Sequence, residues 1–438
     1  MSLGGYIMQV TFGIDVSKSN STVCELIGES KNELTITNDR PGFIQLLHEL
    51  AAFSKHPQII FEATGVYSRR LQAFLEDYGY EYVVLNPLKA KKEMNMGLRY
   101  NKTDKTDAYH LALIQRLYRH PVNQSESQTY KQLNALSRFY DQLTSDLVIA
   151  KNRLHQALQS TFPEIENLFS IARGKNYWQI VARYPHCDLV RKDDKKQIIN
   201  WLMKLKGIAF NHAQRTTDKL IELAHLAYPV VSCSDIEVQQ AQYYARRLLN
   251  LSNQRQRIIT KMVKLAKTLP NHDLENLESI PGFAQTTAVR VLAELGDLRR
   301  FSNPNKINAF IGIDPGRYQS GEMDSNLSIT KHGNAVARKL LYRAIGQIDN
   351  AAKTNPCHIA DYYESKKLSS QTKGFKKIAI ASIHKLIRTI YALIINDQPY
   401  DYNVATHNQK DFSRNSLIKY IITLSPKIRY GSGLICRV

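Results

Sequence analysis

The sequence of 438 residues lacks the patterns that mark several classes of protein. Its cysteines are odd in number and scattered, with no CxxC pair: Cys24, Cys187, Cys233, Cys357 and Cys436. Neither a zinc site nor a disulfide framework is predicted, and reduced thiols in a cytoplasmic protein are the simplest interpretation. We see no apolar run near the roughly 20 residues needed to cross a bilayer. The first residues, MSLGGYIMQVTFGID, lack a basic segment followed by an apolar core, so we expect no secretory signal.

Several catalytic patterns are also missing. There is no Ser-His-Asp order, no metal-spaced Cys/His set, no GxGxxG and no P-loop, so ATP is not implied. What the chain has in excess is positive charge, with 59 Lys and Arg against 39 Asp and Glu and a net charge of +20. Such a field attracts a polyanion. Nucleic acid is the commonest such partner, and an anionic membrane surface is the alternative.

Residues 8–124 predict an α/β domain. Strands are expected in MQVTFGIDV, STVCELIG and NELTITN, and two more in HPQIIFEATG and YEYVVLNP. Helices are expected at about 43–53, in VYSRRLQAFLEDYG up to Gly79, and in DKTDAYHLALIQRLYRH. Three early strands followed by alternating helices and strands are the order expected of an RNase H-like mixed sheet, although periodicity also allows other α/β folds.

Four acids stand at the ends of these elements. Asp15 ends the first strand and Glu62 ends a buried one, whereas Asp104 and Asp107 lie three apart on one helical face. Carboxylate oxygens are the ligands that Mg²⁺ prefers. Two such ions about 3.5–4 Å apart would clamp the attacking and leaving oxygens of an in-line displacement. Taken singly, an acid at such a position is more often unrelated to a metal, because an Asp after a strand is often a turn residue or a helix cap.

Residues 125–270 predict a helical, coiled-coil or linker region. Apolar residues keep a 3–4 spacing over more than three heptads, at Leu133, Leu136, Tyr140, Leu143, Leu147, Ala150, Leu154 and Ala157. A weaker second seam contains Leu248, Leu251, Ile258, Met262 and Leu265. These two long helices could pair between protomers or within the chain as an internal hairpin. Between them, residues 163–235 show helical periodicity and no recognisable chemistry.

Residues 271–400 predict a further, mainly helical domain. LESIPGFAQTTA has a tight turn at Pro281-Gly282, and two later amphipathic helices are rich in Lys and Arg. The polar segment IGIDPGRYQSGEMDSN is expected to be a loop, and alone its Ser320 looks like an ordinary loop serine. Ser325 and Ser328 are close competitors. The tail, 401–438, is polar with one apolar patch, LIKYIITL, and has no assigned role.

Several strings in this order resemble a known family. GIDVSKS (13–19), FEATGVY (61–67), LNP (85–87) and NKTDKTDA (101–108) resemble the DEDD-type transposases of bacterial insertion sequences. These are bridge-RNA-guided serine recombinases, and the family includes pilin-gene invertases. Their N-terminal domain is similar to the Holliday-junction resolvase RuvC. The resemblance covers about 8–160 and 270–400, and it implies that Asp15, Glu62, Asp104 and Asp107 are the metal-binding acids.

The resemblance extends to the C-terminal region. PGRYQSG resembles the segment that carries the family's nucleophilic serine, which implies Ser320. LESIPGFAQTTA looks like a helix-hairpin-helix element whose amides point at a phosphate, with Ala284 in place of the usual second glycine. Predicted nucleic-acid contacts, some from flanking charge and some from the resemblance, are Lys102, Lys105, Gly282, Arg317, Lys331, Arg338 and Lys339. For the basic ones, a solvated helix face is the competing interpretation.

Together with the sequence features, the resemblance implies an enzyme that cuts and rejoins DNA. By that resemblance Ser320 would attack a strand while the four acids bind Mg²⁺ or Mn²⁺, and a phosphoserine would preserve the bond energy of each phosphodiester. The resemblance also implies a dimer or tetramer with composite sites, double-stranded donor and target DNA, and a structured noncoding guide RNA in a bacterial, nucleoid-associated setting. The alternatives are a RuvC-like nuclease that uses water, a DNA invertase of the same family, and a nucleic-acid-binding scaffold without catalysis.

Overall fold

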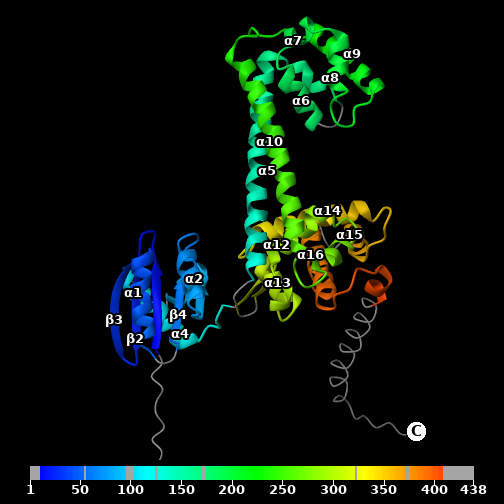
Figure 1. Cartoon of the computed structure of the whole chain (residues 1–438). Coiled ribbons are helices and arrows are strands. Elements are labelled where there is room, and N and C mark those ends of the chain that lie inside the picture. The colour runs from blue at the N-terminus through cyan, green and yellow to red at the C-terminus, as the bar shows by residue number, and fades with distance from the viewer. Residues whose placement is uncertain are drawn as a thin grey trace, which may run out of the picture. The chain divides into compact units, whose positions relative to one another are not determined.

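The computed structural model describes residues 10–53, 56–94, 103–123, 127–169, 174–320, 323–369 and 374–407, with only the backbone at 94 and 317–327. The expected contact Lys102 and the patch LIKYIITL lie outside these residues. The chain divides into two compact units, 1–125 and 126–438. Figure 1 colours the first blue to cyan and the second cyan to red.

The first unit contains a five-stranded mixed sheet in the order β3-β2-β1-β4-β5. Its strands are β1 (Val10–Val16), β2 (Asn20–Ile27), β3 (Ser30–Thr37), β4 (Gln58–Glu62) and β5 (Tyr82–Leu85). β1, β2 and β3 pair antiparallel, whereas β4 runs parallel to both β1 and β5. The expectation of an α/β N-terminal domain with five strands is confirmed.

Helices cover both faces of this sheet. α1 (Arg40–Ala51) and α2 (Ser68–Asp77) pack on the face formed by residues such as Phe12, Ile14 and Phe61. α4 (Asp104–Tyr118) packs on the opposite face, against Ile60 and Cys24. A further short helix, α3 (Pro87–Met94), follows β5 and contains Lys89, Lys91 and Lys92. Because side chains alternate along a strand, consecutive residues of β1 face opposite sides of the sheet and therefore different helices.

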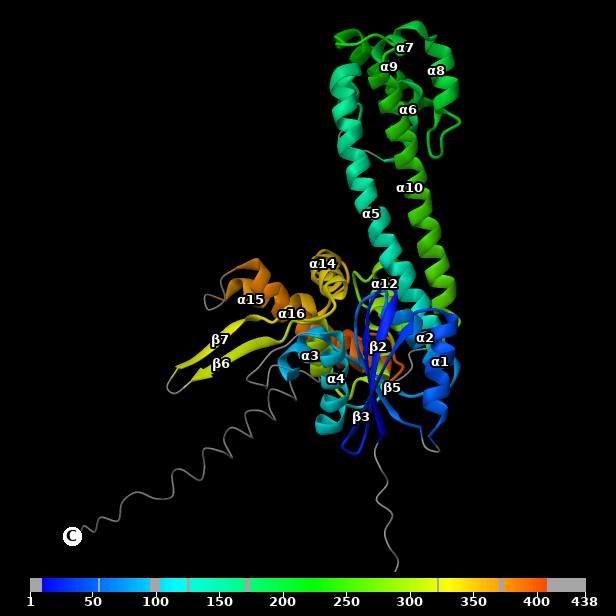
Figure 2. The same ribbon diagram turned by 90° about the vertical axis from the view of Figure 1, so that its left-hand side faces the viewer.

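The second unit is built on two long helices that pair within the chain. α5 (Gln128–Thr161) and α10 (Ile236–Ala266) lie side by side over most of their length (Figures 1 and 2). Buried along α5 are Leu133, Tyr140, Leu143, Leu147, Ala150, Leu154 and Ala157, all residues of the expected seam. Between the two arrangements left open by the sequence, the structure has the internal hairpin.

The segment between these two helices forms a helical insertion at one end of the pair, where α5 ends and α10 begins. It contains η1 (Pro163–Asn167), α6 (Lys175–Arg183), α7 (Cys187–Lys192), α8 (Lys195–Leu202) and α9 (Phe210–Leu226). Its side chains, among them Trp178 and Leu220, share one core with Phe162 and with the adjoining halves of α5 and α10. We call residues 163–235 the helical insertion.

The opposite end of the α5–α10 hairpin packs into the C-terminal body. Its helices are α11 (Asp273–Glu278), α12 (Gln285–Leu295), η2 (Leu298–Arg300), α13 (Pro304–Ile311), α14 (Ala335–Ala351), α15 (His358–Leu368) and α16 (Phe375–Ile395). α12 is buried throughout its second half and lies at the centre of the core. Figure 2 shows a β-hairpin, β6 (Pro315–Ser320) and β7 (Met323–Ile329), extending away from these helices.

This hairpin corrects the expectation of a loop at IGIDPGRYQSGEMDSN. The segment pairs antiparallel from Pro315↔Ile329 to Ser320↔Met323, with a register shift between Pro315 and Arg317. The strands are polar and project from the body, so they bear little of the alternating apolar pattern by which a half-buried strand is recognised.

α16 corrects a second expectation. By length and composition this helix of 21 residues could cross a membrane, although no such run was expected. Its apolar face is nevertheless part of the core of the C-terminal body, where Ile383, Leu386 and Ile390 are fully buried. A buried core helix passes the same test of length and hydropathy, so this helix is weak evidence for a membrane span.

Candidate functional site

The strand register aligns the first two acids. Neighbouring β1 and β4 are parallel and in register up to Ile14↔Phe61, so the next positions along both strands are Asp15 and Glu62. Ile14 and Phe61 both lie in the core beneath α1 and α2. Since alternate residues face opposite sides, both acids face the side of the sheet that α4 covers. Each is half-buried.

The other two acids belong to the first turn of α4, whose direction brings that turn to the same edge. Near its C-terminus, Arg116 donates hydrogen bonds to the carbonyls of Leu26 and Gly28, at the far end of the sheet. Its middle crosses Gly13, where an added Cβ would lie only 2.1 Å from the Ala108 carbonyl oxygen. The helix therefore runs antiparallel to β1, and its N-terminus approaches the strand end that carries Asp15.

Local sequence dictates where α4 begins. Thr103 caps the helix by accepting from the amide of Thr106, and Thr106 accepts from the amide of Thr103 in return. This capping box starts the helix at Asp104 and puts Asp107 one turn later on the same side. Acids in a first turn also stabilise a helix through its dipole, so both have a structural use that does not require a metal.

An open hollow of about 690 Å³ lies at this edge. Its lining residues are polar and come from the β1–β2 turn, strands β2 and β3 and the start of α4: Ser17, Lys18, Ser19, Asn20, Thr22, Thr35, Thr103, Asp104 and Lys105. Of the four acids, Asp104 alone lines the hollow. Thr22, which also lines it, is the strand partner of Asp15.

The four carboxylates are nonetheless not the most compact set of metal ligands. Across the described ranges, the one group of at least three ligand side chains with all ligand atoms within 4.8 Å is His186, Asp188 and Cys233 in the helical insertion. Among the described residues the four acids form no such group, although the strand register and the direction of α4 bring their backbone positions to one edge of the sheet.

Of the two lysines expected beside the acids, Lys105 can be assessed. Its exposed ammonium lies 3.4 Å from a carboxylate oxygen of Glu33 on β3. Exposed pairs of this kind contribute little to stability, so exchanging Glu33 for a phosphate would cost little. Lys105 also lines the hollow at the acidic edge.

The expected nucleophile belongs to the second unit. Ser320 is the last residue of β6, at the outer end of the hairpin, where its backbone pairs with Met323. The base of the hairpin is fixed by Thr330, whose amide and hydroxyl donate to the carbonyl and carboxylate of Asp314. Arg317 is also on β6. The hairpin thus presents Ser320 at its tip, away from the helical core.

The basic residues that follow the hairpin differ in their surroundings. Lys331 and Lys339 are exposed, and Lys331 adopts a left-handed backbone with φ of 57°. Arg338 is half-buried and donates a hydrogen bond of 2.6 Å to the carbonyl of Ile311, at the C-terminus of α13. That bond gives Arg338 a clear structural function, so the two lysines are better placed for phosphate.

The Pro281-Gly282 turn has a packing explanation. Gly282 has a φ of +84°, and an added Cβ would meet the Gln347 carbonyl oxygen on α14 at 2.6 Å. Ile280 and Phe283 on either side are buried. Close backbone approach therefore accounts for this glycine, and the phosphate contact expected at the turn stays a prediction.

A buried glutamate that no sequence pattern singled out holds the segment after the hairpin. Glu294, at the end of α12, is 2% exposed. It accepts hydrogen bonds from Asn334, Ser137 and Asn134 and pairs with Arg138 at 2.8 Å. Asn334 caps α14, so this network ties the helix after the hairpin to α5 and α12.

Comparison with known proteins identifies the class of molecule in which these features occur together. Residues 12–163 match a family model described as a transposase, and residues 274–364 match one described as transposase of the IS116/IS110/IS902 family. The first match contains all four acids and the second contains Ser320. The sheet edge and the hairpin are therefore parts of two transposase domains.

Individual relatives agree with this class. The pilin gene-inverting protein of Moraxella bovis is 21% identical over 399 residues, which is 90% of this chain and 98% of that protein. The transposase for insertion sequence element IS1111A of Coxiella burnetii is 29% identical over 134 residues, 30% of this chain and 35% of its own. An uncharacterised protein of insertion element IS116 from Streptomyces clavuligerus is 24% identical, covering 82% of this chain and 88% of its own.

The chain belongs to the IS116/IS110/IS902 family of transposases. It is accordingly a DNA strand-transfer enzyme. Apart from its first residue, the helical insertion lies between the two matched regions and outside both.

Proposed function

We propose that this transposase cuts and rejoins DNA through two chemical groups: divalent metal held by Asp15, Glu62, Asp104 and Asp107, and the Ser320 hydroxyl. The observation that carries the proposal is the approach of three chain segments to one sheet edge. The ends of β1 and β4 and the start of α4 supply only oxygen ligands there, which suits Mg²⁺ or Mn²⁺. We also propose that the sheet is RNase H-like and related to RuvC, since its strand order and directions agree with that fold.

The donor set fits a hard divalent cation. Carboxylates gathered at one edge repel one another unless a cation neutralises them. The first turn of α4 adds partial positive charge from its amides, but a helix terminus contributes only about half an elementary charge. Bound metal would polarise the scissile phosphate. Asp15 and Glu62, fixed by paired strands, would orient it, and Asp104 and Asp107 would complete its oxygen ligands.

Ser320 would supply the nucleophile. Its hydroxyl oxygen bonds to phosphorus and loses its proton, while one bridging deoxyribose oxygen leaves and takes up a proton. The DNA is then held as a phosphoserine ester, and a second deoxyribose hydroxyl reverses the exchange. Each step replaces one phosphoester with another, which requires no ATP. The position of Ser320 at the tip of a projecting hairpin supports this role, because such a tip can reach a substrate bound elsewhere.

The partners follow from charge and family. A net charge of +20 suits binding to nucleic acid backbones. Lys105, Lys331 and Lys339 are the described basic residues that we assign to phosphate, with Gly282 and Arg338 as weaker assignments. We propose that a structured noncoding RNA selects donor and target DNA, and that a dimer or tetramer brings the two together. We further propose a cytoplasmic, nucleoid-associated protein.

A covalent-trapping assay with matched RNA and DNA tests the chemistry. Wild type should form a protein–DNA adduct in Mg²⁺, and Ser320→Ala should abolish both the adduct and recombination while DNA binding is kept. Asp15→Ala should abolish cutting. Ser328→Ala, on the partner strand of the same hairpin, is the matched control and should keep the adduct. If Ser320→Ala still cuts DNA at the wild-type rate, the chain uses water, as a RuvC-like nuclease does.

An invertase is the second candidate, and one observation favours it. The pilin gene-inverting protein of Moraxella bovis aligns with 90% of this chain, across both units. Inversion and transposition share the same strand chemistry and differ in how the two DNA sites are arranged. A plasmid assay with inverted and with separate sites distinguishes them: an invertase flips the segment between inverted sites, and a transposase inserts a donor into a separate target.

A further inference from the structure

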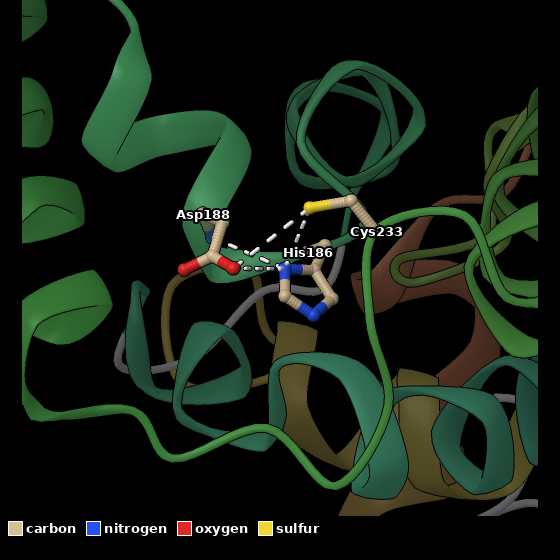
Figure 3. Close-up of side chains that lie close together, drawn as sticks. All are labelled: His186, Asp188 and Cys233. Atoms are coloured by element: carbon tan, nitrogen blue, oxygen red, sulfur yellow. Dashed lines mark hydrogen bonds and ion pairs between the residues drawn. The ribbon is translucent and has the colours of Figure 1, made fainter.

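The helical insertion contains a compact group of three potential metal ligands outside the transposase motifs. His186 and Asp188 flank the first residue of α7, and Cys233 lies in the loop that precedes α10. Figure 3 shows their side chains converging, with the His186 Nδ1 atom directed toward the other two. Forty-five or more residues separate Cys233 from its partners, so the fold rather than a local motif assembles the group.

The spacing of the three ligand atoms suits one small tetrahedral ion. Nδ1 of His186 lies 3.2 Å from Sγ of Cys233 and 3.7 Å from Oδ2 of Asp188, and Sγ lies 4.0 Å from that oxygen. Zinc bonds of about 2.0–2.3 Å at tetrahedral angles place ligand atoms roughly 3.3–3.6 Å apart. The observed triangle needs shifts of only a few tenths of an ångström to reach those lengths.

Surrounding contacts already orient each ligand. The buried His186 has its Nε2 atom 3.0 Å from the Val231 carbonyl, which fixes the proton on Nε2 and leaves the Nδ1 lone pair directed into the group. Such a carbonyl partner is the usual support of a metal-binding histidine. Arg191 holds the other carboxylate oxygen of Asp188 at 2.7 Å, so Oδ2 is the one that faces the group.

The group also has an interpretation without a metal, in which His186 serves as a helix cap. The Nδ1 atom also accepts the Asp188 amide as the cap of α7, at 3.1 Å. A cation bound at Nδ1 would have to replace that hydrogen bond.

We propose that His186, Asp188 and Cys233 form a zinc site with three protein ligands and a fourth position open to water. A thiolate, an imidazole and a carboxylate are a ligand set that zinc accepts and that Mg²⁺ does not favour. The ion would cross-link the start of α7 to the loop before α10. It would thereby fasten the helical insertion at the point where the chain returns to the long hairpin. This inference does not depend on the proposed strand chemistry.

Cobalt substitution in the full-length chain tests the site. After removal of bound metal with a chelator, Co²⁺ should produce thiolate-to-cobalt charge-transfer absorption in the near ultraviolet, and Zn²⁺ should displace it. Cys233→Ser should abolish this absorption. His186→Gln and Asp188→Asn should weaken Zn²⁺ binding beyond the roughly 10–100-fold that loss of an outer hydrogen-bond partner costs. The exposed His212→Gln and Asp218→Asn, both on α9, are matched controls and should bind like wild type.

The outcomes separate this proposal from the acidic site. Carboxylates produce no thiolate absorption, so Asp15→Ala should keep the cobalt signal even if strand transfer is lost. Zinc should also raise the thermal unfolding midpoint of wild type but not of Cys233→Ser. Absence of the absorption in wild type, or its persistence in Cys233→Ser, overturns the zinc site and leaves the group as a hydrogen-bonded helix cap.

Discussion

Gly13→Ala tests the connection between the fold and the acidic edge. Gly13 lies on β1 where α4 crosses the sheet, and its missing side chain allows the two backbones to approach. An added Cβ would stand 2.1 Å from the Ala108 carbonyl oxygen and 2.4 Å from the Ala112 amide nitrogen, whereas ordinary contact begins at 3.4 Å. Both atoms belong to the backbone, so no side chain can rotate away.

The required displacement gives the expected magnitude. To restore a contact of 3.4 Å from 2.1 Å, α4 must move away from the sheet by at least about 1.3 Å near Ala108. The first turn of α4 carries Asp104 and Asp107, so both acids shift relative to Asp15 and Glu62. A misplacement of about 1 Å can cost roughly a hundredfold in rate. Overpacking of this kind also costs about 1–3 kcal/mol in the free energy of unfolding.

The assay compares Mg²⁺-dependent DNA cleavage with stability. Cleavage should fall by roughly a hundredfold under conditions in which circular dichroism shows the variant folded. Gly346→Ala, on α14, is the control, because an added Cβ there meets nothing within 4 Å. Wild-type cleavage and wild-type urea stability in Gly13→Ala would refute the close β1–α4 packing. Lost stability with unchanged cleavage of the folded fraction would refute the acidic edge as the active site.

Three further predictions concern the C-terminal body. Burial lowers the pKa of His358 from 6.5 to about 4, so the unfolded chain takes up this proton first as the pH falls. The stability that neutral His358 contributes is complete above pH 6.5 and declines toward pH 4. Between pH 7.5 and pH 5, the free energy of unfolding measured with urea should therefore fall by about 2 kcal/mol more in wild type than in His358→Gln. Arg299→Lys should lower the free energy of unfolding by about 2–3 kcal/mol, because the Arg299 guanidinium donates to both carboxylate oxygens of the buried Asp273, at 2.8 and 2.9 Å. An unchanged urea midpoint would contradict this. Glu294→Leu should cost about 3–5 kcal/mol, since Arg138 and the amides of the network lose their acceptor, and a cost below 1 kcal/mol would show that the network contributes little.

Much of the first unit could be predicted because its signals are local. Alternating apolar residues and turn residues indicated the five strands, and the TDKTD segment carried its own capping signal at Thr103 and Thr106. The acids at the ends of β1 and β4 could therefore be placed from the sequence alone. That Asp15 and Glu62 are neighbours depends on strand order, which periodicity leaves open and the parallel β1–β4 pairing supplies.

The second unit was harder where contacts are distant in sequence. The seam of α5 was recognisable, yet its partner helix begins after the whole helical insertion, and heptads alone do not tell an internal pair from an intermolecular one. The polar strands of the β6–β7 hairpin lack the alternating apolar pattern that predicts a strand, so the sequence favours a loop there. His186 and Cys233 lie 47 residues apart with no CxxC spacing, so only tertiary structure joins them.

The same contrast explains why the four acids are easier to predict from the sequence than Ser320. A metal-binding acid needs a rigid support, and strand ends and helix starts are both rigid and recognisable in a sequence. Asp104 shows the overlap, because the capping box that starts its helix places it in the lining of the hollow. The proposed nucleophile, Ser320, has the opposite requirement. A nucleophile that must reach bound DNA is served by the outer end of a projecting hairpin, and there only the resemblance to the family singles out one serine among its neighbours.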